Sequence, residues 1–392
     1  MVTAFSPDAA RGFDDRFSAI RTAAAERFAA AALPSTNEEI WRYSRIESLD
    51  LDRFVPAESS TSVEADGVDL SALLADDEPE VIGAGAPDVF AELNQAFMTP
   101  TVIRVPHGHT VAAPIVVTHH LAGHVDHAPA VFPRLVIDAA DDSDVTVVER
   151  FITHGDETLE VLVAPVLQVR AAPAARVRYL ALNEAGPATW QIGNQQSVGD
   201  RDSSTMLATV TLGGDYVRAR TEARLVGPGG STKQVALYFA GGEQMHDFRT
   251  IQDHDAPHTH SDLLFKGAVQ DTAASVYTGL IKIRAHAGGT TAYQTNRNLT
   301  LSEGAWAESV PNLDIETNDV KCSHASTVGP IDEEQRFYLE SRGVRPEVAE
   351  RLVVLGFFDE VIGQLPSGPL TDDLRSRVAA KLDIGSRQEV LT

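Results

Sequence analysis

The residues best suited to chemistry lie close together near the end of the chain. Cys322 is the only cysteine, and His324 follows it by two residues. In an extended segment, residues two apart point to the same face, so a thiol and an imidazole would lie side by side. Both groups suit iron or zinc. A free cysteine can equally act as a small buried hydrophobe beside a solvated histidine, and the two residues alone do not choose between these roles.

The cysteine count limits what kind of metal site the chain can build. One cysteine excludes an internal disulfide framework and a self-contained Cys₄ zinc or iron–sulfur site. If a metal binds at Cys322 and His324, a second chain must contribute further ligands. The sequence also lacks a Gly-x-x-x-x-Gly-Lys-Ser/Thr phosphate loop, a Gly-x-Ser-x-Gly elbow and a His-Glu-x-x-His pair.

A second group of potential metal ligands lies further upstream. It comprises His246, His254, His258 and His260, with Asp253, Asp255 and Asp262 between them. His258 and His260 would share a face of an extended segment, as in a cupin metal site, but Leu264 occupies the position where such a site has a glutamate. We favour the alternative, in which these histidines line strand ends and turns.

The charge balance restricts the possible partners. The chain of 392 residues has 32 Lys and Arg against 56 Asp and Glu, so its formal net charge is −24. A nucleic-acid binder or a protein of anionic membrane surfaces needs a basic footprint, and none is visible. The first residues lack the basic start and apolar run of a signal peptide, and no stretch is long enough to span a bilayer. We therefore expect a soluble, cytoplasmic protein.

The elements that must position these residues fall into three zones. Apolar residues at steps of three and four predict a helix over residues 8–32, and residues 57–90 read as an acidic, loosely packed connection. From about Asn94 to Asn318, short alternating runs separated by Gly, Pro, Asp and Asn predict strands without an intervening helix. No repeat of fixed period is visible, so two sandwiches, a propeller and a solenoid all remain open.

The last zone is helical. Asp332 is placed to cap a helix, Gly343 to end it, and Pro346 to begin the next one at its first position. Apolar residues continue through Leu365, and Thr371 opens a final helix. This is a large apolar surface for about 60 residues, so it must pack on the core or dock a partner.

Several motifs, taken together, resemble a known family. They are Glu39–Tyr43 (Glu-Ile-Trp-Arg-Tyr), Leu93–Phe97, His254–Ser261, Lys266-Gly267, Tyr277–Gly279, Asn296–Leu299 and Asp319–His324 with the following Phe337–Leu339 and Ser341–Gly343. In this order, over most of the chain, they are similar to the SufB/SufD family of SUF iron–sulfur cluster assembly proteins. Thr295 stands where SufB-like chains carry a functional cysteine, and Ala325 where they carry a glutamate, so the resemblance is to the SufD branch. Family members usually have glycine at the position of Ala325.

The resemblance implies both an architecture and a role. The fold would be a mainly β, right-handed parallel β-helix (β-solenoid) with helical ends: residues 1–90 an N-terminal helical region with an acidic linker, 91–330 the core and 331–392 a helical docking region. The chain would be a non-catalytic scaffold that pairs with SufB through the end of the core and binds the ATPase SufC through its last helices. Alone, it would dimerise through the open coil.

The resemblance also implies which residues act. His324 would be a ligand of iron or of a nascent iron–sulfur cluster at the SufB interface, and Cys322 would be a second, weaker candidate for such a ligand. The isolated chain would bind neither iron nor cluster tightly. The main alternative is a β-helix enzyme acting on polysaccharide. Such an enzyme is usually exported and needs a groove of acids and aromatics, whereas aromatic residues make up only 6% of this chain.

Overall fold

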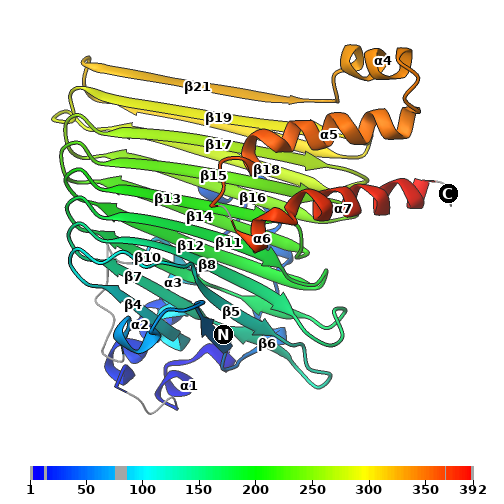
Figure 1. Cartoon of the computed structure of the whole chain (residues 1–392). Helices are drawn as coiled ribbons and strands as arrows, with labels where there is room; N and C mark the ends of the chain where they lie inside the picture. The colour runs from blue at the N-terminus through cyan, green and yellow to red at the C-terminus, as the bar shows by residue number, and fades with distance from the viewer. Residues whose placement is uncertain (1–2, 13–15, 76–85, 367, 390–392) are drawn as a thin grey trace.

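The computed structural model describes residues 3–12, 16–75, 86–366 and 368–389, and its body is a β-solenoid of about seven coils (Figure 1). Successive strands alternate between two sheets, here called sheet A and sheet B. Sheet A contains β3 (Leu74–Ala75), β4 (Thr99–Val105), β7 (Pro133–Ala139), β10 (Val166–Ala171), β12 (Thr189–Gly199), β14 (Tyr216–Leu225), β16 (Met245–His254), β18 (Ala274–Ile283) and β20 (Trp306–Ile315), with β1 (Phe54–Pro56), β6 (Ala128–Val131) and β9 (Val161–Val163) at one side. Sheet B contains β2 (Ser60–Glu64), β5 (Ile115–Leu121), β8 (Asp144–Thr153), β11 (Arg176–Glu184), β13 (Ser204–Thr211), β15 (Ser231–Ala240), β17 (His260–Val269), β19 (Thr290–Thr300) and β21 (Val320–Gly329). The solenoid expected from the family resemblance is confirmed.

The coils differ in length, which explains why no fixed period is visible in the sequence. Along sheet B, residues paired in register are 28, 27, 29, 31 and 30 positions apart, in the ladder Arg176–Ser204–Ser231–His260–Thr291–Lys321. The insertions fall in the turns, because parallel pairing constrains only the strands.

The connection expected over residues 57–90 is more ordered than predicted. Ser60–Glu64 forms β2, which pairs antiparallel with β5, and Leu74–Ala75 pairs antiparallel with β4. These two short strands cover the first edge of each sheet, which would otherwise be open. The rest of this acidic segment, residues 76–85, lies outside the described residues.

The N-terminal helices close the first end of the solenoid. The expected helix over residues 8–32 consists of α1 (Pro7–Arg11) and α2 (Ser18–Ala30), with residues 13–15 outside the described part. With α3 (Val89–Phe97) they bury an aromatic cluster in which the rings of Phe5, Phe97 and Phe132 meet at centroid distances between 5.6 and 6.1 Å. This end is therefore sealed by a core of its own.

The C-terminal helices behave as their capping residues predict. Asp332 accepts hydrogen bonds from the backbone N–H groups of Glu334 and Gln335 and begins α4 (Glu333–Ser341). Gly343 follows in the left-handed region at φ +87°, and Pro346 begins α5 (Pro346–Ile362). α6 (Pro369–Asp372) and α7 (Leu374–Glu389) complete the chain.

Part of the apolar surface of these helices packs on the outer face of sheet B. α5 and α7 bury Val354, Phe358 and Val378 against Leu237 and Phe239. Lys381 of α7 adds a polar anchor, since its Nζ donates to the Leu212 carbonyl and to Gln244 Oε1. Burial of this ammonium lowers the pKa of Lys381 to about 7. α4 differs, because it buries no residue and projects past β21, the last strand (Figure 1).

Candidate functional site

The site predicted around Cys322 and His324 lies on the last strand of sheet B. β21 pairs with β19 on one side only, in a register that places Cys322 over Ala292 and His324 over Gln294. β20 likewise ends sheet A. The final coil therefore presents two strands whose outer backbone groups are available for pairing.

Both candidate residues face the interior of the solenoid. Val320 and Cys322 pack against Ile281, Ile283 and Ala292, and His324 lies on the same face two residues further on. The predicted common face is thus confirmed by the extended conformation of β21. The two side chains differ in exposure: Cys322 is half-buried, whereas His324 is exposed at the open end. Burial raises the pKa of the Cys322 thiol, which keeps it protonated and limits its strength as a ligand.

A chain of polar side chains runs from the buried interior to this open end. Tyr238 Oη donates to Asn298 Oδ1 at 2.7 Å and accepts from Asn296 Nδ2 at 2.9 Å. Asn296 Oδ1 accepts from Ser309 Oγ at 2.7 Å, and Ser309 Oγ lies 2.7 Å from Ser326 Oγ on β21. The four links connect both sheets across the interior. A buried network of this kind holds its members in a single arrangement when every member is paired.

Gln294 lies directly beneath His324, one coil further in. Its side chain is buried beside Tyr277, whose hydroxyl shares a 2.9 Å hydrogen bond with Thr250. Neighbouring parallel strands are about 4.8 Å apart, so the buried Gln294 side chain is the next one inward from His324 on the same face of sheet B. The open end is consequently polar at its base, whereas the first coils are filled with Val, Ile and Leu.

Sequence reasoning missed this polar interior, although a signal for it is present. Gln294, Asn296 and Asn298 recur at every second residue of a strand, on the face that would normally carry apolar side chains. Three amides in such a row indicate a polar interior, in which Asn296 and Asn298 hydrogen-bond to Tyr238. No local feature indicates that Tyr238, 58 residues before Asn296, is their partner.

Two glycines of the family-like motifs make room for this network. A Cβ atom on Gly267 would lie 1.9 Å from the ring of Tyr238, and one on Gly279 would lie 2.4 Å from the Tyr277 hydroxyl. Real Cβ atoms never approach other atoms so closely, and both rings are enclosed. The motifs Lys266-Gly267 and Tyr277–Gly279 are therefore explained by packing around the two tyrosines.

Replacing Gly267 with alanine is expected to destabilise the solenoid by about 1–3 kcal/mol, because Tyr238 must move and its hydrogen bonds to Asn296 and Asn298 must lengthen. The free energy of unfolding in urea measures the effect. Gly356→Ala in α5 is the matched control, since nothing lies within 4 Å of its added methyl group and alanine favours a helix. Equal stability of the Gly267 variant and the native chain would contradict this account.

The four upstream histidines do not converge. His246 and His254 are buried, and burial lowers their pKa values to about 3 and about 4, so both are neutral at physiological pH. Both ring nitrogens of His254 are engaged, by Thr259 Oγ1 at 2.7 Å and Ser261 Oγ at 2.8 Å. His258 occupies a turn at φ +58°, and His260 lies in a groove on the outer face of sheet B. Within the ranges that the structure describes, no three or more His, Cys, Asp and Glu residues are grouped as a metal site.

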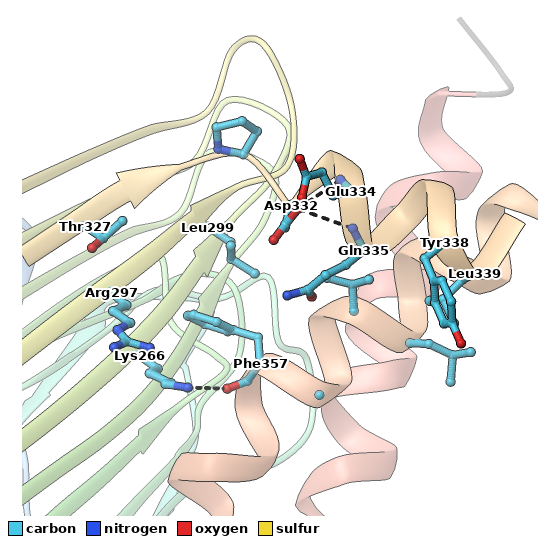
Figure 2. Close-up of a pocket in the computed structure, with 14 residues that line it drawn as sticks. Lys266, Arg297, Leu299, Thr327, Asp332, Glu334, Gln335, Tyr338, Leu339 and Phe357 are labelled. Atoms are coloured by element: carbon cyan, nitrogen blue, oxygen red, sulfur yellow. Dashed lines mark hydrogen bonds between the residues drawn. The ribbon is translucent and has the colours of Figure 1, made fainter. Parts of the chain in front are cut away.

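A groove of about 1100 Å³ lies next to the open end, between α4, α5 and the outer face of β19 and β21. Figure 2 shows Lys266 on its floor, with its Nζ donating to the Phe357 carbonyl at 2.8 Å. The same ammonium lies 2.5 Å from Glu360, and this hydrogen bond lowers the pKa of the Glu360 carboxyl. Lys266 thereby fixes α5 against the sheet.

The upper wall of this groove is apolar and accessible. Tyr338 of α4 is 57% exposed and Leu352 of α5 is 43% exposed, and both line the groove. Phe337, next to Tyr338 on α4 but outside the groove lining, is 71% exposed. Figure 2 places Tyr338 and Leu339 at the side of the groove opposite Lys266. Large aromatic side chains exposed together are typical of a surface that another protein covers.

Comparison with known proteins places this geometry in a family. Residues 121–357 match the SufBD core domain of the SUF system for FeS cluster assembly. An iron–sulfur cluster assembly SufBD family protein of Mycobacterium tuberculosis is 32% identical over 376 residues, which cover 92% of each chain. The iron–sulfur cluster assembly protein SufD of Escherichia coli is 28% identical over 86% of this chain and 78% of its own length. That of Bacillus subtilis is 33% identical over 66% of this chain and 59% of its own. None of the described helices has the length and apolar character needed to cross a membrane.

Proposed function

This chain belongs to the SufBD family of the SUF iron–sulfur cluster assembly system, and we propose that it serves there as a scaffold subunit without catalytic activity of its own. A role in iron–sulfur cluster assembly follows from the family, and the alternative of a polysaccharide enzyme is not favoured. The observation that carries the proposal is the position of His324 and Cys322 on the inward face of an open terminal coil.

The proposed partner at the open coil is a SufB-type chain. β20 and β21 end their sheets, so a second solenoid could continue both sheets by pairing along these strands. The side chains around His324 would then be enclosed between the two subunits. In the isolated chain, a second copy would occupy the same edge and form a homodimer.

The cluster is the cargo of this site and not a resident group. In the proposal, His324 supplies an imidazole ligand to iron of the nascent cluster, and Cys322 is the second candidate ligand on the same strand. The partner subunit contributes the remaining ligands, since a cluster needs about four. The isolated chain would accordingly hold neither iron nor cluster tightly.

The proposed partner at α4 and α5 is a SufC-type ATPase. The groove beside these helices combines exposed aromatic rings with a rigid floor fixed by Lys266. Movements of an ATPase bound there would act directly next to β21, because only three residues separate that strand from α4. We place the assembled complex in the cytoplasm.

Co-purification tests the proposal in its simplest form. An affinity-tagged chain, isolated from its native host under anaerobic conditions, is expected to bring with it a SufB-type and a SufC-type chain, identified by mass spectrometry. Iron and sulfide should be present in the complex and nearly absent from the isolated chain. Recovery of the chain without either partner, together with turnover of a sugar polymer, would refute the proposal.

A further inference from the structure

Histidines are concentrated at one corner of the solenoid that the proposed function does not use. Five of the 13 histidines of the chain lie at the end of β5 or in the loops that follow β5 and β8: His119, His120, His124, His127 and His154. The loops that follow the two strands pack closely, since a Cβ atom on Gly123 would lie 2.2 Å from Leu159. This corner is near the first coils, whereas His324 is on the last one.

Two of these side chains meet nitrogen to nitrogen. His120 Nδ1 and His154 Nε2 are 2.8 Å apart, with ring centroids at 5.0 Å. Ser62 Oγ lies 3.0 Å from the other nitrogen of His120 and so fixes the orientation of that ring. His154 is exposed. At this distance the two nitrogens share a single proton, which lies between the lone pair of His120 Nδ1 and that of His154 Nε2.

We propose that His120 and His154 bind a divalent late first-row transition metal ion, such as Zn²⁺, in place of this shared proton. Imidazole is a favoured ligand of Zn²⁺, Ni²⁺ and Cu²⁺. With Zn–N bonds of about 2.0–2.1 Å in tetrahedral geometry, the two nitrogens must separate to roughly 3.3 Å, which a small rotation of exposed His154 provides. The net charge of −24 raises the local concentration of cations.

Water completes the coordination of the ion. No third His, Cys, Asp or Glu among the described residues is grouped with the pair. Asp156, two residues after His154, turns its Oδ1 toward Thr158, from whose backbone N–H it accepts at 2.9 Å and from whose hydroxyl it accepts at 2.6 Å. The site is thus a two-histidine site open to solvent and to a further ligand.

The other histidines of the corner lack this geometry. His119 is buried with both nitrogens engaged, by Glu149 Oε1 at 2.8 Å and Thr61 Oγ1 at 2.9 Å. His124 and His127 stack face to face at 4.5 Å, and His124 Nδ1 accepts from the backbone N–H of Asp126 at 3.2 Å. The His124–His127 pair is consequently a matched control with the same residue types in the same loop region.

The test uses the full chain without a histidine tag, titrated with Zn²⁺ by isothermal calorimetry and with Cu²⁺ by electron paramagnetic resonance. We expect one ion per chain and hyperfine coupling to two nitrogens. His120→Gln and His154→Gln should each weaken binding at least about tenfold, because two tethered ligands become one, while the variant with both His124→Gln and His127→Gln should bind as the native chain does.

Three results would overturn the proposal. They are no binding of either ion by the native chain, unchanged binding by the His120 and His154 variants, and loss of binding in the His124/His127 variant alone. Circular dichroism confirms that each variant is folded, and the exposed position of His154 makes its variant the safest of them. The role of His324 is unaffected by any of these outcomes, since the two sites are at opposite ends of the solenoid (Figure 1).

Discussion

Replacing His324 with alanine is expected to reduce cluster formation by the assembled complex by at least about tenfold, while the complex still forms and hydrolyses ATP. The imidazole is exposed at the open end, and β21 is held by its backbone pairing with β19, so the substitution removes a ligand and leaves the strand intact. Iron and acid-labile sulfide per complex, measured after reconstitution, report the effect, and size-exclusion chromatography reports assembly.

The same strand offers a matched control for this experiment. Lys321 is exposed on the opposite, outward face of β21, and Lys321→Ala should leave cluster formation unchanged. His324→Gln separates ligation from packing, because the amide fills similar space without an imidazole nitrogen for iron. If the alanine complex matures clusters as well as the native one, His324 has only a structural role. If that complex fails to assemble, the glutamine complex decides the question.

Changing Phe337 and Tyr338 together to glutamate is expected to weaken binding of the SufC-type ATPase by about a hundredfold or more. Tyrosine is enriched among the few interface residues whose loss costs about 2 kcal/mol or more, and two carboxylates in an apolar contact carry a desolvation cost. Because α4 buries no residue, thermal unfolding of the chain itself should change little. Calorimetric titration of the purified chain with the ATPase measures the loss.

Point substitutions are preferable to deletion of the helices from residue 332 onward. α5 and α7 cover the apolar outer face of sheet B, including Leu237 and Phe239, so a truncated chain would expose that face and aggregate. Val125→Glu is the control, because Val125 is 82% exposed on a loop far from α4. Undiminished ATPase binding by the Phe337/Tyr338 variant would place the docking surface elsewhere.

The features that could be predicted from the sequence are those that depend on near neighbours. Alternation of apolar residues predicts the strands, and the capping residues Asp332, Gly343 and Pro346 predict the limits of α4 and the start of α5. The common face of Cys322 and His324 follows from their spacing alone once the segment is extended. All of these are set by hydrogen bonds and steric contacts within a few residues.

Contacts between residues far apart in the chain could not be predicted in this way and become visible only in the folded solenoid. Strand patterns left sandwich, propeller and solenoid open, and the solenoid was expected from the family resemblance, because coils of 27–31 residues carry no fixed period. The contact of Tyr238 with Asn298 and that of His120 with His154 span one or two coils. Which residues of different coils become neighbours depends on the summed lengths of the turns between them. That sum cannot be read from the sequence around either residue. The polar interior beneath His324 and the pair of His120 and His154 therefore form only when the coils of the solenoid stack on one another.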